Sequence, residues 1–119
     1  MENKPIILLV DDEENFLEVA SVKLRSGGFE VVTANNAIDA ISKAEEFQPD
    51  LILSDVNMPP GISGLELENA LRKNPKTSEL KIAFLTVLHD IKSGNLKFLN
   101  KAKNIETLNE DVTNLIRTL

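Results

Sequence analysis

Short apolar runs alternate with segments of helical periodicity along the chain, and this alternation is the strongest constraint on its fold. The apolar runs lie at residues 6–10, 51–54 and 81–85, and residues 29–33 alternate enough for a further short strand. Between them, apolar residues recur every three or four positions, as on the inner face of a helix. Strands that alternate with helices pair in parallel, because each crossover helix returns the chain to the same end of the sheet. The sequence therefore predicts an α/β fold with a doubly wound, mostly parallel sheet.

Caps and helix-breaking residues delimit the first two predicted helices. The first helix runs from about Glu14 to the pair Gly27-Gly28. Asn35 or Asn36 can cap the second helix, which Pro49 ends. The inner face of that second helix is expected to carry the apolar side chains Ile38, Ile41, Ala44 and Phe47.

The second half of the chain continues the alternation with one anomaly. It adds a third helix at 64–73, a fifth short strand at 96–99 and a final helix. The apolar stripe of the final helix is Ile105, Leu108, Val112, Leu115 and Leu119. Only residues 86–95 join the fourth and fifth strands, whereas a helical crossover usually needs about ten to twelve residues or more. We therefore expect five strands, with the fourth crossover helix short or missing.

Residues that can do chemistry stand where the predicted strands end. Asp11 and Asp12 follow the first strand, Asp55 follows the third, and Thr86 ends the fourth. The carboxyl ends of parallel strands meet at one edge of the sheet, where open α/β sheets bind ligands. Lys101, just after the fifth strand, adds a cation at the same edge. The competing interpretation is that these acids only cap helices and loops.

Three carboxylates gathered at one edge must be neutralised. Each pair of like charges about 5 Å apart repels by about 3 kcal/mol at an effective dielectric constant of about 20. Oxygen ligands, in a chain without Cys, favour a hard ion such as Mg²⁺, which binds carboxylates, water and phosphate oxygens. A carboxylate nucleophile beside Mg²⁺, a lysine and a hydroxyl suits phosphoryl transfer. Asp55 would attack phosphorus and become an aspartyl phosphate.

Composition argues against several other functions. The net charge of −6 and the absence of Trp and Tyr disfavour a nucleic-acid surface. Without Cys, the 119-residue chain has no disulfide, thiol nucleophile or Cys-ligated metal. The polar start at 1–5 runs into too few apolar residues for a signal peptide or a membrane span. We expect one cytosolic domain over residues 1–119 that contacts neither nucleic acid nor membrane directly.

In combination, these residues resemble the receiver domain of bacterial two-component response regulators over essentially the whole chain. The resemblance is carried, in order, by Asp11-Asp12, Asp55 with Met58-Pro59, Thr86 and Lys101. It implies a flavodoxin-like fold with strand order 2-1-3-4-5. It also implies that Asp55 accepts a phosphoryl group from a sensor histidine kinase or a phosphotransfer protein, and that a conformational change then signals to an effector. Such a domain catalyses only its own phosphorylation and dephosphorylation, so we do not class it as an enzyme.

The resemblance also implies roles for the remaining site residues. Mg²⁺ would be held by Asp11, Asp12, Asp55 and the backbone carbonyl of Asn57. Asp11 would act mostly through water. Thr86 and Lys101 would contact the phosphoryl group, and Phe98 matches the aromatic switch position of the family. Lys103 competes with Lys101 for the lysine role.

Some residues depart from the family pattern. Val87 stands after Thr86 where the family usually has Ala or Gly, and Ala102 replaces the usual proline after Lys101. The loop at 60–64 is one residue longer than usual. The shortened fourth crossover belongs to the face through which receivers usually dimerise or pass their signal, which leaves homodimer formation open.

Two alternative functions follow from these observations. Val87 and the short crossover are compatible with an atypical, non-phosphorylated receiver that acts as a protein-interaction module. An aspartate-nucleophile phosphatase of the haloacid-dehalogenase kind is the other alternative. That class needs a second Asp two residues after the nucleophile, and Asn57 occupies this position.

Overall fold

The computed structural model of the chain describes residues 4–56, 63–86, 98–100 and 106–119. Its strands are β1 (Ile6–Val10), β2 (Glu30–Ala34), β3 (Leu51–Asp55), β4 (Ile82–Thr86) and β5 (Phe98–Asn100). Its helices are α1 (Glu14–Ser26), α2 (Ala37–Phe47), α3 (Gly64–Lys73) and α4 (Leu108–Thr118). All strand pairs are parallel, and the sheet has the order β2-β1-β3-β4-β5. The predicted parallel, doubly wound α/β architecture is confirmed.

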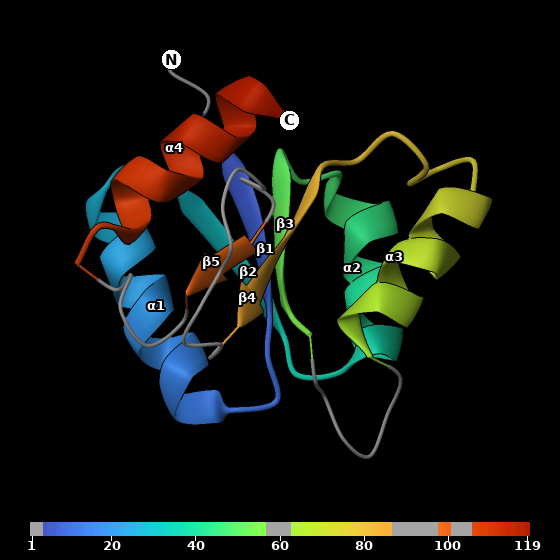
Figure 1. Cartoon of the computed structure of the whole chain (residues 1–119), viewed down its shortest axis with the longest axis horizontal. Helices are drawn as coiled ribbons and strands as arrows, with labels where there is room; N and C mark the ends of the chain where they lie inside the picture. The colour runs from blue at the N-terminus through green and yellow to red at the C-terminus, as the bar shows by residue number, and fades with distance from the viewer. Residues whose placement is uncertain (1–3, 57–62, 87–97, 101–105) are drawn as a thin grey trace.

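The sheet separates two hydrophobic cores. Helices α1 and α4 cover one face of the sheet, and α2 and α3 cover the other (Figure 1). Within β1, Ile7 and Leu9 belong to the core under α1 and α4, whereas Leu8 and Val10 belong to the opposite core. Successive side chains of a strand point to opposite faces. A strand covered on both faces is therefore apolar at every position, which explains the continuous apolar runs.

The inner face of α2 differs from the prediction. Ile38 is 82% exposed and Phe47 is 40% exposed, whereas the buried side chains of this helix are Ala37, Ala40 and Ala44. The alanines follow the same three- and four-residue spacing as the larger residues, so periodicity alone allows either stripe. Ala44 is buried as predicted, and Ile41 is partly buried against the same core. The prediction is wrong for Ile38 and Phe47, whose places on the inner face are taken by Ala37 and Ala40.

Two element boundaries near the C-terminal end also differ from the prediction. Strand β5 is described over Phe98–Asn100 and ends one residue later than predicted, because pairing with β4 sets Phe98 beside Phe84 and Asn100 beside Thr86. The predicted strand positions 96 and 97 lie outside the described residues. Leu119 lies beyond α4 and is 41% exposed, so it does not extend the buried stripe. Ile105 and the fourth crossover (87–97) lie outside the described residues. The short or missing fourth helix therefore stays a prediction.

Side-chain caps explain where α2 and α3 begin. Of the two candidate caps for α2, Asn36 makes the capping bond, since its Oδ1 accepts from the backbone N–H of Asp39 at 2.8 Å. At α3, Ser63 and Glu66 form a reciprocal capping box. Across the described part of the chain, the helices lack the length and apolar character that crossing a bilayer requires.

Candidate functional site

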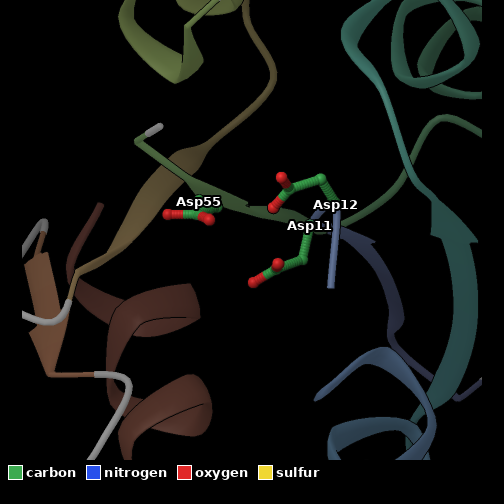
Figure 2. A group of neighbouring side chains, drawn as sticks. All are labelled: Asp11, Asp12 and Asp55. Atoms are coloured by element: carbon green, nitrogen blue, oxygen red, sulfur yellow. The ribbon is translucent and has the colours of Figure 1, made fainter. Parts of the chain in front are cut away.

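Three carboxylates meet beyond the carboxyl ends of β1 and β3. Asp11 and Asp12 directly follow β1, and Asp55 is the last residue of β3. One oxygen from each of the three side chains lies within 4.8 Å of the other two. Figure 2 shows the three carboxylates gathered in one space at the ends of the central strands. The structure thus brings together the three acids that were expected at this edge.

Strand register explains why these acids meet. Strands β1 and β3 are neighbours, and Val10 pairs with Ser54. The next residue on each strand, Asp11 and Asp55, therefore emerges at the same level of the sheet. Their burial differs, because Asp11 is fully buried, Asp55 is half-buried and Asp12 is exposed. The cluster is consequently open to solvent on one side.

Hydrogen bonds hold Asp11 in place before α1 begins. Its Oδ1 accepts from the backbone N–H of Glu13 at 2.9 Å. Its own backbone N–H donates to the carbonyl of Ala34, at the end of β2, at 3.1 Å. The N-cap residue of α1, Glu13, makes no side-chain capping bond. Asp11 therefore combines a local backbone bond, as in the capping interpretation, with a place in the acidic cluster.

Ser54 and Gly64 contact the backbone of Asp55, and the sequence patterns did not single out either for the site. The Ser54 hydroxyl is fully buried and donates to the Asp55 carbonyl oxygen at 2.9 Å. Gly64 is the buried first residue of α3 and donates its N–H to the carbonyl of Val56 at 2.8 Å. A serine among the aliphatic residues of a buried strand is a sequence signal for Ser54. For Gly64, the signal is a glycine at the first position of a helix.

The donor set of the cluster fits a hard divalent cation. Ligand oxygens around one Mg²⁺ lie about 3–4 Å apart, because each sits about 2.1 Å from the ion. Carboxylate oxygens that already lie within 4.8 Å of one another need only small side-chain rotations to reach that spacing. An ion there would also neutralise the mutual repulsion of the three charges.

The other predicted site residues are described only in part or not at all. Thr86 is the last residue of β4, next to β3 in the sheet, so its backbone ends at the same edge as Asp55. Phe98 begins β5. The orientation of both side chains falls outside the described part of the structure. The following residues also lie outside it: Asn57, Met58, Pro59, Val87, Lys101, Ala102 and Lys103.

Comparison with known proteins agrees with this fold. The family model of the response regulator receiver domain matches residues 7–113. The DNA-binding dual master transcriptional regulator RpaA of Synechocystis is 30% identical over 95% of this chain, which covers 49% of RpaA. The chain spans half or less of the length of this and three further curated relatives that it matches.

Solved structures of response regulators superpose closely on the chain. Chemotaxis response regulator CheY4 of Vibrio cholerae has a TM-score of 0.81 and 30% identity, with 95% of this chain and 99% of CheY4 covered. Response regulator TrrA of Thermotoga maritima, solved in complex with Mg²⁺-BeF, has a TM-score of 0.77 and 36% identity. That alignment covers 93% of this chain and 98% of TrrA. The chain therefore belongs to the response regulator receiver domain family of two-component signal transduction.

Proposed function

We propose that this receiver accepts a phosphoryl group on Asp55 in a Mg²⁺-dependent reaction and signals through the conformational change that follows. The observation that carries the proposal is the cluster of Asp11, Asp12 and Asp55, whose carboxylate oxygens lie within 4.8 Å of one another. The similarity to TrrA, which was solved with Mg²⁺-BeF, supports the same conclusion. The phosphoryl donor would be a sensor histidine kinase or a phosphotransfer protein.

The chemistry assigns a distinct task to each part of the cluster. Asp11, Asp12, Asp55 and the backbone carbonyl of Asn57 would hold Mg²⁺. When bound, the ion would offset the negative charge of the carboxylates and of the phosphoryl oxygens. A carboxylate oxygen of Asp55 would attack phosphorus in line, forming a P–O bond while the P–N bond to the donor histidine breaks. The bonding electron pair leaves with the histidine nitrogen.

Partial exposure suits Asp55 to this role. The residue is half-buried, so a donor could reach its carboxylate from solvent while its backbone stays within the sheet. Thr86 and Lys101 would contact the oxygens of the transferred phosphoryl group. A hydroxyl donor and a fixed cation stabilise the negative charge that phosphoryl transfer spreads over these oxygens.

The domain would act only on itself. We propose that residues 1–119 form a single receiver domain that catalyses its own phosphorylation and dephosphorylation without releasing a product of a separate substrate. The effector would be a protein, because the net charge of −6 disfavours direct contact with nucleic acid. Homologous transcriptional regulators are about twice as long as this chain or longer. We therefore do not propose their transcriptional activity for this chain.

Phosphorylation in vitro tests the proposal. The protein is incubated with acetyl phosphate and Mg²⁺ and weighed by intact-protein mass spectrometry. We expect the mass of one phosphoryl group to be gained, and to be lost on treatment with hydroxylamine, which cleaves acyl phosphates. EDTA and Asp55→Ala should both abolish the gain. The matched variant Asp39→Asn, which alters an aspartate on α2, should preserve it.

Three results would contradict the proposal. A wild-type protein that gains no mass from acetyl phosphate or from a cognate kinase would point to the non-phosphorylated interaction module instead. A mass gain that survives Asp55→Ala would place the phosphoacceptor elsewhere. Turnover of an aryl phosphate beyond one equivalent would revive the phosphatase alternative.

A further inference from the structure

We propose that Gly64 and Ser54 are positioning residues. They fix the backbone of Asp55 and thereby orient its carboxylate toward Asp11 and Asp12. The inference rests on the proposed role of Asp55 as phosphoacceptor. Ser54 precedes Asp55 in β3, and Gly64 is the first residue of α3, the next element described along the chain. Both residues act on the same atom, the backbone carbonyl oxygen of Asp55.

Gly64 approaches Asp55 more closely than any other residue type can. A Cβ atom placed on Gly64 would lie 2.4 Å from the carbonyl oxygen of Asp55 and 3.2 Å from its carbonyl carbon. It would also lie 3.2 Å from the Cα of Val56. These atoms belong to the backbone, which cannot rotate away as a flexible side chain can. Either α3 or the end of β3 would have to move.

Backbone conformation does not account for a glycine at this position. Among the described glycines, Gly28 has a positive φ, whereas Gly64 does not. Alanine has the higher helix propensity, so propensity would favour it at the first position of α3. The space taken by the Asp55 carbonyl is therefore the physical reason for glycine at this position.

Helix α3 is anchored, so a clash at Gly64 would be transmitted to Asp55. The backbone N–H of Gly64 donates to the carbonyl of Val56 at 2.8 Å. The Ser63 side chain accepts from the N–H of Glu66 at 3.2 Å, and the Glu66 side chain accepts from the N–H of Ser63 at 3.3 Å. Leu67 then buries its side chain completely in the core. These contacts hold the first turn of α3 against the end of β3.

Ser54 holds the same carbonyl through a hydrogen bond. Its hydroxyl donates to the Asp55 carbonyl oxygen at 2.9 Å, and its side chain is fully buried. The direction of that carbonyl sets the peptide plane between Asp55 and Val56. Pairing of Asp55 with Leu85 of β4 constrains the backbone further. The Cα–Cβ bond of Asp55 is thereby directed toward the cluster, where its carboxylate lies within 4.8 Å of the other two.

The decisive variant is Gly64→Ala in the full chain, with Gly27→Ala as the matched control. A Cβ at Gly27 would also be too close to a neighbour, 2.6 Å from the side chain of Asn109. Gly27, however, caps the end of α1 and does not touch Asp55. Both variants are compared with wild type for Mn²⁺ affinity by electron paramagnetic resonance and for the rate of phosphorylation by acetyl phosphate at saturating Mg²⁺. Urea unfolding identifies conditions in which each variant is fully folded.

Under those conditions, a loss of stability alone changes neither the Mn²⁺ dissociation constant nor the phosphorylation rate. Misplacement of a reacting group by about 1 Å can cost up to about 100-fold in rate. We expect Gly64→Ala to weaken Mn²⁺ binding and to slow phosphorylation, each on the order of 10-fold. Gly27→Ala should change neither. Ser54→Ala removes the hydroxyl without adding an atom, and should weaken Mn²⁺ binding and slow phosphorylation, each by a few-fold.

The outcomes separate this inference from the proposed function. Wild-type affinity and rate in a folded Gly64→Ala protein would overturn the inference, as would equal losses in Gly64→Ala and Gly27→Ala. If Gly64→Ala does not fold, Ser54→Ala decides in its place, and wild-type values in that variant would overturn the inference. A wild-type protein that binds Mn²⁺ but is never phosphorylated would contradict the proposed function alone. The Mn²⁺ affinities of wild type and the variants would still show whether Gly64 and Ser54 orient the Asp55 carboxylate.

Discussion

The carboxylates of Asp11 and Asp55 lie within 4.8 Å of each other at the junction of β1 and β3. At that separation two unit charges repel by about 3 kcal/mol when the effective dielectric constant is about 20. Asp12 adds a third charge from the exposed side of the cluster, where water weakens its repulsion. This repulsion destabilises the folded state, and packing elsewhere in the molecule offsets it. A bound cation would reduce the repulsion.

Removing the charge of Asp55 should stabilise the protein when no divalent ion is present. We expect Asp55→Asn in EDTA to raise the free energy of unfolding by about 1 kcal/mol, a value reduced from the Coulomb figure by solvent screening. Mg²⁺ should stabilise wild type, because the ion binds the folded state only, and should stabilise Asp55→Asn much less. Urea unfolding with and without Mg²⁺ measures both effects. Glu46→Gln, which removes an exposed charge from α2, is the control, and an Asp55→Asn protein less stable than wild type in EDTA would contradict the expectation.

Two basic side chains cover the outer edge of strand β2. Arg25, from α1, donates Nη2 to the carbonyl of Val31 at 3.4 Å, and Lys43, from α2, donates Nζ to the carbonyl of Thr33 at 2.5 Å. Because β2 ends the sheet on this side, these carbonyls have no neighbouring strand to pair with. Uncovered edge strands are sites at which chains associate.

Loss of both basic residues should promote self-association. We expect the double variant Arg25→Met with Lys43→Met to form dimers or larger species that increase with protein concentration in sedimentation velocity. Its free energy of unfolding should fall by about 1 kcal/mol for each hydrogen bond lost. Lys73→Met, an exposed position on α3, controls for the general loss of positive charge. A double variant that stays monomeric at concentrations where wild type does would argue against edge protection.

Neighbouring asparagines before α2 should differ in their contribution to stability. Asn36 caps the helix by accepting from the N–H of Asp39, whereas Asn35 donates its side-chain amide to exposed Glu14 at 3.3 Å. We expect Asn36→Ala to lower the free energy of unfolding by about 1 kcal/mol and Asn35→Ala to lower it less. Urea or thermal unfolding of the two single variants makes the comparison, and equal losses would show that the cap is not the stabilising contact.

The buried hydroxyl of Thr77 closes the end of α3. Thr77 is fully buried, and its Oγ1 donates to the carbonyl of Leu71 in the last turn of the helix at 2.8 Å. Carbonyls in a last helical turn lack partners within the helix. Thr77→Val keeps the shape but removes this donor, while the Leu71 carbonyl keeps its bond from the N–H of Asn74 at 3.2 Å. We therefore expect the free energy of unfolding to fall by about 1 kcal/mol. Thr77→Ser retains the hydroxyl and should lose less; a larger loss in Thr77→Ser than in Thr77→Val would attribute the stability to the methyl group instead.

Local pattern was sufficient for most of the elements of this fold. The apolar run of β1 and the glycine and lysine that bound α3 lie where the sequence predicted them. Periodicity was insufficient for α2, because Ile38 and Ala37 both fit a helical stripe and only packing against the sheet selects the alanine. The choice between Asn35 and Asn36 as cap likewise depends on where the chain leaves β2.

The sequence by itself determined that acids stand at strand ends, because a residue's place along a strand follows from its local pattern. It also determined that parallel pairing brings those ends to one edge. Only the tertiary structure decided how closely Asp11 and Asp55 approach, since that distance depends on the register of Val10 beside Ser54. The close approach of Gly64 to the Asp55 carbonyl also depended on the tertiary structure. Contacts between separate elements arise from how those elements pack, and neither element's own sequence pattern specifies them.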